Sequence, residues 1–128
     1  MDRLEASGMR RRLLERSAEV RADIRRELLK YDHEKYGELA DQLSDPGEHS
    51  VADLLVDVDL AEISRDVEEF RDIEAALLRI AHGTYGLCVD CDEAIDPQRV
   101  ARVPAASRCY TCQEAYERKG QQKHPGTL

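Results

Sequence analysis

Four cysteines in two close pairs are the residues of this chain best suited to chemistry. Cys88 and Cys91 form one Cys-x-x-Cys motif, Cys109 and Cys112 form a second, and seventeen residues lie between the motifs. Each motif brings two thiolates together from one tight turn, and two such turns complete the closed tetrahedral shell that a structural zinc ion prefers. We therefore predict one structural zinc ion per chain. Redox disulfides and an iron–sulfur cluster are the alternative uses of these thiols.

The rest of the chain carries no recognisable catalytic set. Because cysteine fills all four positions of the predicted zinc site, no coordination position stays open for a substrate. The four histidines are scattered along the sequence, and no Ser/His/Asp set, phosphate-binding loop or Gly-x-Gly-x-x-Gly motif occurs. We expect that the protein is not an enzyme.

A second candidate site is the segment from Asp45 to Ser50, with the sequence DPGEHS. Pro46 and Gly47 favour a turn, and the carboxylates of Asp45 and Glu48 flank them. At the end of a long probe, two carboxylates could reach a remote basic or metal-containing site. The alternative is a solvated turn in which Glu48 faces the positive end of the next helix.

Two long helices are expected to position these sites. Apolar residues recur at gaps mostly of three, four or seven from Leu4 to Leu43, and of three or four from Val51 to Ile80. Turn-forming residues at 44–47 separate the runs, and His82-Gly83-Thr84 ends the second. Helices joined by a tight turn run antiparallel, so the roughly 32 residues from Val51 to His82 predict an arm of about 48 Å with the turn at its tip. The alternative is half of a helical bundle that another chain completes.

The predicted fold class is mainly α: a long antiparallel two-helix coiled-coil hairpin plus a small four-cysteine zinc-finger lobe with a short C-terminal helix. Residues 1–83 form the hairpin, with its tip at about 44–50. Residues 84–119 form the lobe with a helix over 113–119, and residues 120–128 form a flexible tail. Aromatic residues make up 5% of the chain and charged residues 36%, which suits exposed helices sharing a thin seam better than a thick core.

The charge distribution narrows the choice of partner. The formal net charge is −8, and between Asp41 and Glu74 twelve acidic residues face only two basic ones, Arg65 and Arg71. A protein that binds DNA by neutralising phosphates needs the opposite surface, so no direct specific DNA binding is expected. No apolar run approaches the ~20 residues that cross a bilayer, and no signal peptide is apparent, so we expect a cytoplasmic protein without a membrane partner.

These residues resemble the DksA/TraR zinc-finger regulators of bacteria. The matching features are the entry Tyr85-Gly86-Leu87-Cys88, the seventeen-residue gap, Arg99-Val100, Pro104, Ala106 and the second motif Cys109-x-x-Cys112. Counting back from Cys88 without a gap brings Asp45-Pro46-x-Glu48 onto the Asp-Pro-x-Asp tip of that family. The resemblance therefore runs from the tip to Cys112, and the first helix matches only in pattern.

The resemblance implies that the hairpin enters the secondary channel of RNA polymerase while the zinc lobe docks outside. It also implies that the tip residues Asp45, Glu48 and Ser50 lie near the polymerase active site and alter promoter complexes without chemistry of their own. Glu48 replaces the second aspartate of the family, and Ser50 stands where the family has alanine. These changes leave the strength and direction of regulation open.

The resemblance also raises the question of the stringent-response alarmone ppGpp, which such proteins bind together with polymerase through basic residues. The same ungapped register places Asp72, Val103 and Gln113 at those positions. An anion with several phosphates is not drawn to that set, which argues against shared ppGpp binding. Two other functions stay open from the sequence: a zinc-ribbon adaptor whose arm pairs with another protein, and a thiol-based redox sensor.

Overall fold

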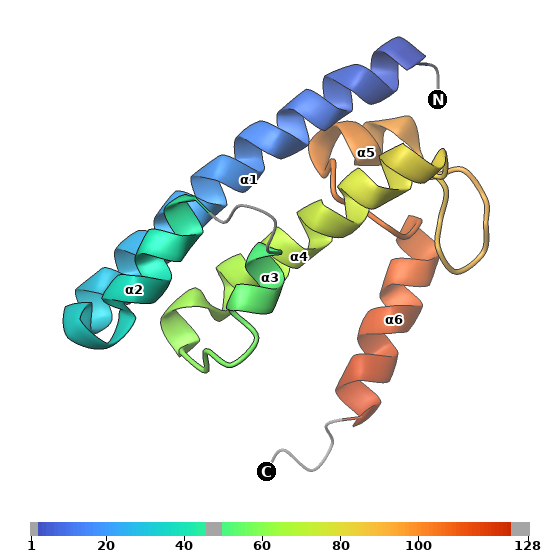
Figure 1. The fold of residues 1–128 in the computed structure, drawn as a ribbon. Coiled ribbons are helices and arrows are strands. Elements are labelled where there is room, and N and C mark those ends of the chain that lie inside the picture. The colour runs from blue at the N-terminus through green and yellow to red at the C-terminus, as the bar shows by residue number, and fades with distance from the viewer. Residues whose placement is uncertain (1–2, 46–49, 124–128) are drawn as a thin grey trace.

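The computed structural model describes residues 3–45 and 50–123, and within them the chain forms six helices (Figure 1). The helices are α1 (Arg3–Tyr31), α2 (His33–Ser44), α3 (Val51–Leu54), α4 (Ala61–His82), α5 (Pro97–Arg102) and α6 (Tyr110–Lys123). The described residues contain no strand, and an isolated bridge between Leu87 and Ala94 is the extended pairing that they show. The predicted mainly α fold with a four-cysteine lobe is confirmed.

Helix α1 is the element against which α2 and α4 pack. Figure 1 shows α4 beside the N-terminal part of α1 and α2 beside its C-terminal part. Helix α5 lies near the N-terminal part of α1, and α6 projects away from the other helices. We call α1 to α4 the helical arm and residues 83–123 the zinc lobe. No helix of the described residues is both long and apolar enough to cross a bilayer.

Most residues of the apolar stripes predicted from the sequence form one continuous core, but Leu4 and Tyr31 of the first stripe are exposed. Spacings of three, four and seven residues place the buried side chains of each helix on a single face. In the arm these side chains are Leu13, Val20, Ile24 and Leu28 of α1, Ala40 and Leu43 of α2, and Ile63, Val67, Phe70, Ile73 and Ala76 of α4. Across the seam Arg16 makes two hydrogen bonds to Glu69, with Nε–Oε2 and Nη2–Oε1 distances of 2.6 and 2.9 Å. No polar or charged side chain of the described residues is fully buried.

The first helix is shorter than predicted. It ends at Tyr31, whereas the sequence predicted a helix to about Leu43. Asp32 has an extended backbone (φ −156°, ψ 92°), and its carboxylate accepts a hydrogen bond from the Lys35 N–H at 3.0 Å. This is an N-cap, for which aspartate is among the preferred residues. The chain turns here and α2 runs back along α1, so that Arg25 Nε donates to the Ala40 carbonyl at 2.7 Å. The helical spacing of apolar residues continues across Asp32, so the sequence pattern gives no sign of this turn.

The second predicted helix is also interrupted. Helix α3 ends at Leu54, a turn follows, and α4 begins at Ala61. Val56 and Val58 are β-branched, and Asp57 and Asp59 compete with helical hydrogen bonds, so the intervening sequence forms helix poorly. With 22 residues, α4 is about 33 Å long. The prediction of a continuous helical arm of about 48 Å from Val51 to His82 is therefore wrong for the described residues.

The C-terminal helix is longer than predicted. Helix α6 begins at Tyr110, three residues before the predicted start, and continues to Lys123, inside the predicted tail. Its first turn is capped by Cys109, whose carbonyl accepts from the Gln113 N–H at 2.9 Å. The second Cys-x-x-Cys motif therefore lies at the N-terminus of α6. The sequence pattern had predicted a loop at this motif, before the start of the helix. The remaining tail residues, 124–128, lie outside the described residues.

Candidate metal centre and adjoining groove

The four cysteines come together as predicted. Their Sγ atoms all lie within 4.8 Å of one another, and Cys91 Sγ is 3.9 Å from Cys109 Sγ. Four sulfurs at about 2.3 Å from a zinc ion at the centre of a tetrahedron are about 3.8 Å apart, so the cluster fits this ion. The four thiols form a structural zinc site. With four protein ligands the coordination shell is closed.

The first pair of cysteines sits on a tight loop that follows α4. Gly83 ends α4 in the left-handed conformation (φ 77°), where a residue without Cβ is favoured. Cys88 N–H donates to the Glu93 carbonyl at 2.8 Å and Ile95 N–H donates to the Gly86 carbonyl at 2.8 Å, which closes the loop. Gly86 (φ 87°) and Asp92 (φ 64°) also have positive φ, and aspartate adopts this conformation more readily than most residues.

The two motifs are also joined to each other outside the sulfur cluster. Arg108 Nε donates to Asp90 Oδ2 at 2.7 Å, and the Val89 N–H donates to the Ser107 carbonyl at 2.9 Å. These bonds hold the residue before Cys109 against the turn that carries Cys88 and Cys91. The approach of the two halves of the site is therefore set by hydrogen bonds as well as by the metal ligands.

The pKa values of the thiols follow from their surroundings. Burial opposes ionisation of Cys88, yet hydrogen bonds from the backbone of Cys109, Cys91 and Asp90 outweigh it and lower the pKa of Cys88 to about 6. Interaction with the Cys109 thiol, together with burial, raises the pKa of Cys112 to about 12. The backbone hydrogen bonds thus favour the thiolate of Cys88. If all four cysteines were ionised, their negative charges would repel one another. A divalent cation removes that repulsion.

The lobe is firmly attached to the end of α4. The buried ring of Tyr85 directs its hydroxyl to the Pro104 carbonyl, to which it donates at 2.7 Å. Arg79 of α4 donates from Nη2 to the Ala106 carbonyl at 3.4 Å. Ile95 and Val100 join the same hydrophobic core as the arm. The orientation of the lobe relative to α4 is therefore fixed by packing and by hydrogen bonds.

The predicted tip residues are placed only in part. Asp45 is the exposed C-cap of α2, and Glu48 lies outside the described residues. Ser50 is the N-cap of α3, accepting from the Asp53 N–H at 3.5 Å and donating to Glu74 Oε2 at 3.3 Å. Because Glu74 is in the middle of α4, Ser50 lies beside that helix and not at the end of a two-helix arm. A joint site of the three residues stays a prediction.

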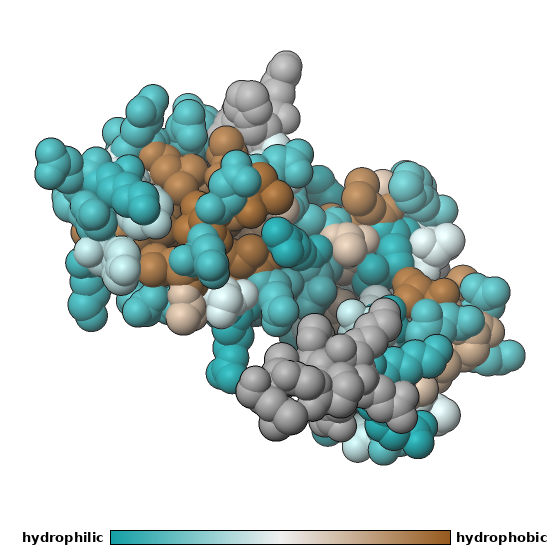
Figure 2. Space-filling view, turned by 90° about the horizontal axis from the view of Figure 1, so that it is seen from below, coloured by the Kyte–Doolittle hydropathy of each residue, from teal (hydrophilic) through white to brown (hydrophobic). Residues whose placement is uncertain are grey.

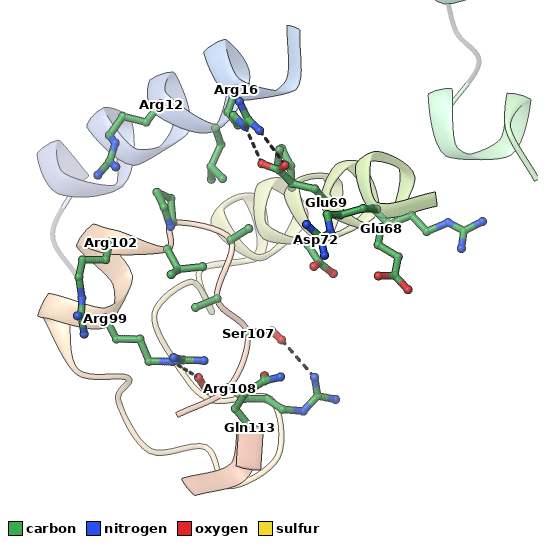
Figure 3. Close-up of a pocket in the computed structure, with 18 of the residues that line it drawn as sticks. Arg12, Arg16, Glu68, Glu69, Asp72, Arg99, Arg102, Ser107, Arg108 and Gln113 are labelled. Atoms are coloured by element: carbon green, nitrogen blue, oxygen red, sulfur yellow. Dashed lines mark hydrogen bonds and ion pairs between the residues drawn. The ribbon is translucent and has the colours of Figure 1, made fainter. Parts of the chain in front are cut away.

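A groove of about 1110 Å³ between α1, α4 and the zinc lobe is a feature that the sequence reasoning missed (Figure 3). Asp72, Val103 and Gln113, which the resemblance singled out, all line it. Arginines from α1, from α5 and from the residue before Cys109 line it as well: Arg12, Arg16, Arg99, Arg102 and Arg108. Partial desolvation in the groove, reinforced by the nearby carboxylate of Glu68, raises the pKa of Asp72, although much of this side chain stays exposed. The clustering of these arginines depends on how the lobe folds onto the arm, so no local sequence signal reveals it.

Comparison with known proteins agrees with the geometry of the lobe. Residues 83–118 match the family model of the prokaryotic dksA/traR C4-type zinc finger. The fold is similar to that of the transcription factor DksA2 from Pseudomonas aeruginosa, with a TM-score of 0.58 and 24% identity over 94% of this chain and 88% of that chain.

Two further relatives are more limited matches. The DnaK suppressor protein from Agrobacterium tumefaciens C58 gives a TM-score of 0.42 and 31% identity, covering 80% of this chain and 92% of that chain. An uncharacterized protein of Aquifex aeolicus (strain VF5) is 37% identical over 54 residues, which are 42% of this chain. This match covers 37% of the length of the Aquifex protein.

Proposed function

We propose that this chain, which is DksA-like in its C4-type zinc finger and in its fold, regulates transcription initiation by binding bacterial RNA polymerase through the secondary channel. The observation that carries the proposal is the DksA/TraR-type zinc lobe, attached rigidly to the end of an acidic helical arm. The lobe docks at the outside of the channel, and the arm makes the contacts inside. The protein acts in the cytoplasm, on promoter complexes, without chemistry of its own.

The charge of the arm supports this partner. Acidic residues are exposed from the end of α2 to the middle of α4: Asp41, Asp45, Asp53, Asp57, Asp59, Glu62, Glu68 and Asp72. A basic channel attracts such a surface and speeds its entry. Asp45, Glu48 and Ser50, from the segment that links α2 to α3 in the sequence, are the residues that we propose to act near the polymerase active site.

The role of ppGpp is a separate part of the proposal. Asp72, Val103 and Gln113 argue against a shared ppGpp site when they are considered one by one. In the structure they line a groove that also contains Arg99, Arg102 and other arginines. The same lining holds seven carboxylates for its seven arginines, so the groove offers no excess of positive charge to an anion with several phosphates. The proposal therefore does not include a shared ppGpp site.

The test is in vitro transcription with purified polymerase from an rRNA promoter and an amino-acid biosynthesis promoter, with and without the protein and with and without ppGpp. We expect the protein to change the output of at least one promoter. We also expect it to compete with Gre factors, which use the same channel, so that Gre-stimulated cleavage of backtracked RNA falls at saturating protein. Unchanged transcription together with undiminished cleavage would refute the proposal and would favour the adaptor alternative.

A further inference from the structure

The two ends of the helical arm carry charges of opposite sign. The N-terminal segment of α1, residues 3–14, contains four arginines and one glutamate. From Glu34 to Glu62, nine acidic residues stand against one lysine, Lys35. With 29 residues, α1 is about 44 Å long. Since α2 lies beside the C-terminal part of α1 (Figure 1), positive and negative charge are separated along the molecule.

The acidic end of the arm also exposes apolar surface. Figure 2 shows apolar side chains gathered on the side of the molecule where α2, α3 and the start of α4 lie, with hydrophilic side chains around them. Val56 is 64% exposed, and Leu39, Leu54 and Val58 are only partly buried. The same elements expose five carboxylates, those of Asp41, Asp53, Asp57, Asp59 and Glu62. An apolar surface with a charged rim is typical of a protein–protein contact. We call these four apolar and five acidic residues the acidic patch.

A complementary surface lies on the outer side of the N-terminal segment of α1. Leu4, Arg11 and Leu14 are seven and three residues apart, which is the spacing of one helical face. Leu4 is 85% exposed and Leu14 is 41% exposed. Arg3, Arg10 and Arg11 are exposed as well. We call these five residues the basic face, because it combines positive charge with apolar side chains.

Neither surface is neutralised within the part of the chain that the structure describes. The ion pairs of the described residues join Arg16 to Glu19 and Glu69, Arg26 to Asp23, and Arg108 to Asp90. None of these pairs involves the acidic patch or the basic face. Both surfaces are therefore available for a contact with another molecule.

A second copy of the chain is the occupant for which the structure itself supplies the complement. The partner of the acidic patch must be basic, with apolar side chains among its charges, and the basic face has both properties on one helix. Nucleic acid would fit the basic face and leave the acidic patch uncovered. A second copy covers both surfaces, because two copies can make the same contact twice about a two-fold axis.

We propose that this chain forms a weak two-fold dimer, in which the basic face of each copy lies on the acidic patch of the other. Opposite charges orient the two copies, and the apolar side chains supply contact area. The net charge of −8 on each copy opposes association, so the dimer forms at high protein concentration and dissociates readily. If the proposed function holds, the dimer is its resting form, because it covers the acidic surface that the arm presents to polymerase.

The first test is sedimentation velocity of the free, zinc-loaded, full-length protein from micromolar to submillimolar concentration. We expect a monomer that converts to a dimer as the concentration rises. Between about 0.1 and 1 M salt the screening length falls from about 10 to about 3 Å, so the dissociation constant should rise at least about tenfold.

The second test reverses the charges of the two surfaces separately. Asp57→Arg combined with Asp59→Arg makes the acidic patch more basic, and Arg10→Glu combined with Arg11→Glu makes the basic face acidic. Each double variant alone should dimerise at least about tenfold more weakly, because like charges then meet in both contacts. An equimolar mixture of the two should form a heterodimer, in which opposite charges meet again. The first variant reduces the net negative charge by four units, so general repulsion alone predicts stronger association for it.

Matched controls make the same changes of net charge on exposed residues of α6, outside both surfaces. They are Glu114→Arg combined with Glu117→Arg, and Arg118→Glu combined with Lys119→Glu. Both controls should dimerise about as well as the wild type. Helical circular dichroism and zinc content verify that every variant is folded.

Four results would overturn the inference. They are a monomer at every concentration, species larger than a dimer, controls that weaken dimerisation as much as the surface variants, and a mixture that forms no heterodimer. Loss of polymerase affinity on changing Arg10 and Arg11, in a chain that stays monomeric, would assign the basic face to polymerase instead. Since sedimentation uses the free protein, a failure to bind polymerase would refute the proposed function and leave the dimer standing.

Discussion

The zinc lobe and the helical arm hold their shape by different means. In the lobe, the four thiols converge on one site, Arg108 donates to Asp90, and Tyr85 donates to the Pro104 carbonyl, so each interaction has defined atoms on both sides. In the arm, stability comes mainly from one apolar stripe on α1, which α2 and α4 share. Directional bonds specify a single arrangement, whereas a repeating stripe accepts more than one partner and register. The lobe is therefore held by directional local bonds, and the arm by the packing of two helices on one shared apolar stripe.

The largest expected effect is that of zinc removal, which should unfold the zinc lobe and leave the helical arm folded. Binding of a structural zinc ion contributes on the order of 10 kcal/mol to folding, and without the metal ion thiolates this close repel one another. We expect chelation to unfold the lobe from about Tyr85 to Tyr116 while α1 to α4 keep most of their helicity. Circular dichroism and limited proteolysis before and after chelation measure this, with zinc content determined in parallel. Complete loss of helicity in the arm would show that the two regions are not independent.

The next effect compares two positions of the α1 stripe. Leu13 and Leu28 are both almost fully buried, and truncating a buried leucine costs about 2–5 kcal/mol, with the lower values where the surroundings can collapse. We expect Leu13→Ala to reduce the free energy of unfolding more than Leu28→Ala, because α2 can move to fill the space at Leu28. Urea denaturation of both variants measures the difference. Equal losses would mean that α2 is held as rigidly as α4.

The contrast also explains how much the sequence could predict. The zinc ligands, the end of α4 at Gly83 and the apolar faces follow from local rules, so each was predicted correctly. The turn at Asp32 was missed because Leu28 and Leu39 keep helical spacing across it, and periodicity does not distinguish a straight helix from one that folds back on itself. The arginine groove was missed because Arg12 and Arg102 meet only through the packing of the lobe on the arm.

A prediction of intermediate size concerns Asp45 and Glu48 in the segment that links α2 to α3 in the sequence. Asp45→Asn combined with Glu48→Gln should abolish the transcriptional effect and leave polymerase affinity within a few-fold, because affinity comes from the broad surfaces of arm and lobe. Loss of charge-assisted contacts costs about 1.5–3 kcal/mol, enough to change promoter lifetime about tenfold or more. Promoter lifetime and polymerase binding are measured on the same protein. Regulation equal to that of the wild type would mean that the two carboxylates play no part in regulation, and loss of binding would make them docking residues.

A smaller effect tests the directional bonding of the lobe. Tyr85→Phe removes the hydroxyl that donates to the Pro104 carbonyl and keeps the ring in the core. Loss of one such hydrogen bond costs about 0.5–1.5 kcal/mol. We expect a lower midpoint of zinc release under chelator, whereas Tyr116→Phe, at an exposed ring of α6, should leave it unchanged. Equal behaviour of the two variants would show that zinc alone orders the lobe.

The smallest expected effect is the pH dependence of the seam between α1 and α4. The hydrogen bonds from Arg16, against the opposing effect of burial, hold the pKa of Glu69 below its ordinary value of 4.5. A carboxyl whose pKa is lowered on folding stabilises the folded state above its unfolded pKa, and this contribution disappears as the pH falls through the lower, folded value. Because both side chains are more than a third exposed, solvent screening keeps the contribution below about 1 kcal/mol. Glu69→Gln should therefore lower stability slightly at pH 7 and not at a pH below the folded pKa, whereas Glu38→Gln on the exposed side of α2 should show no such difference. A loss that is the same at both pH values would mean that Glu69 acts through packing and not through its charge, and the seam would then depend on the apolar stripe alone.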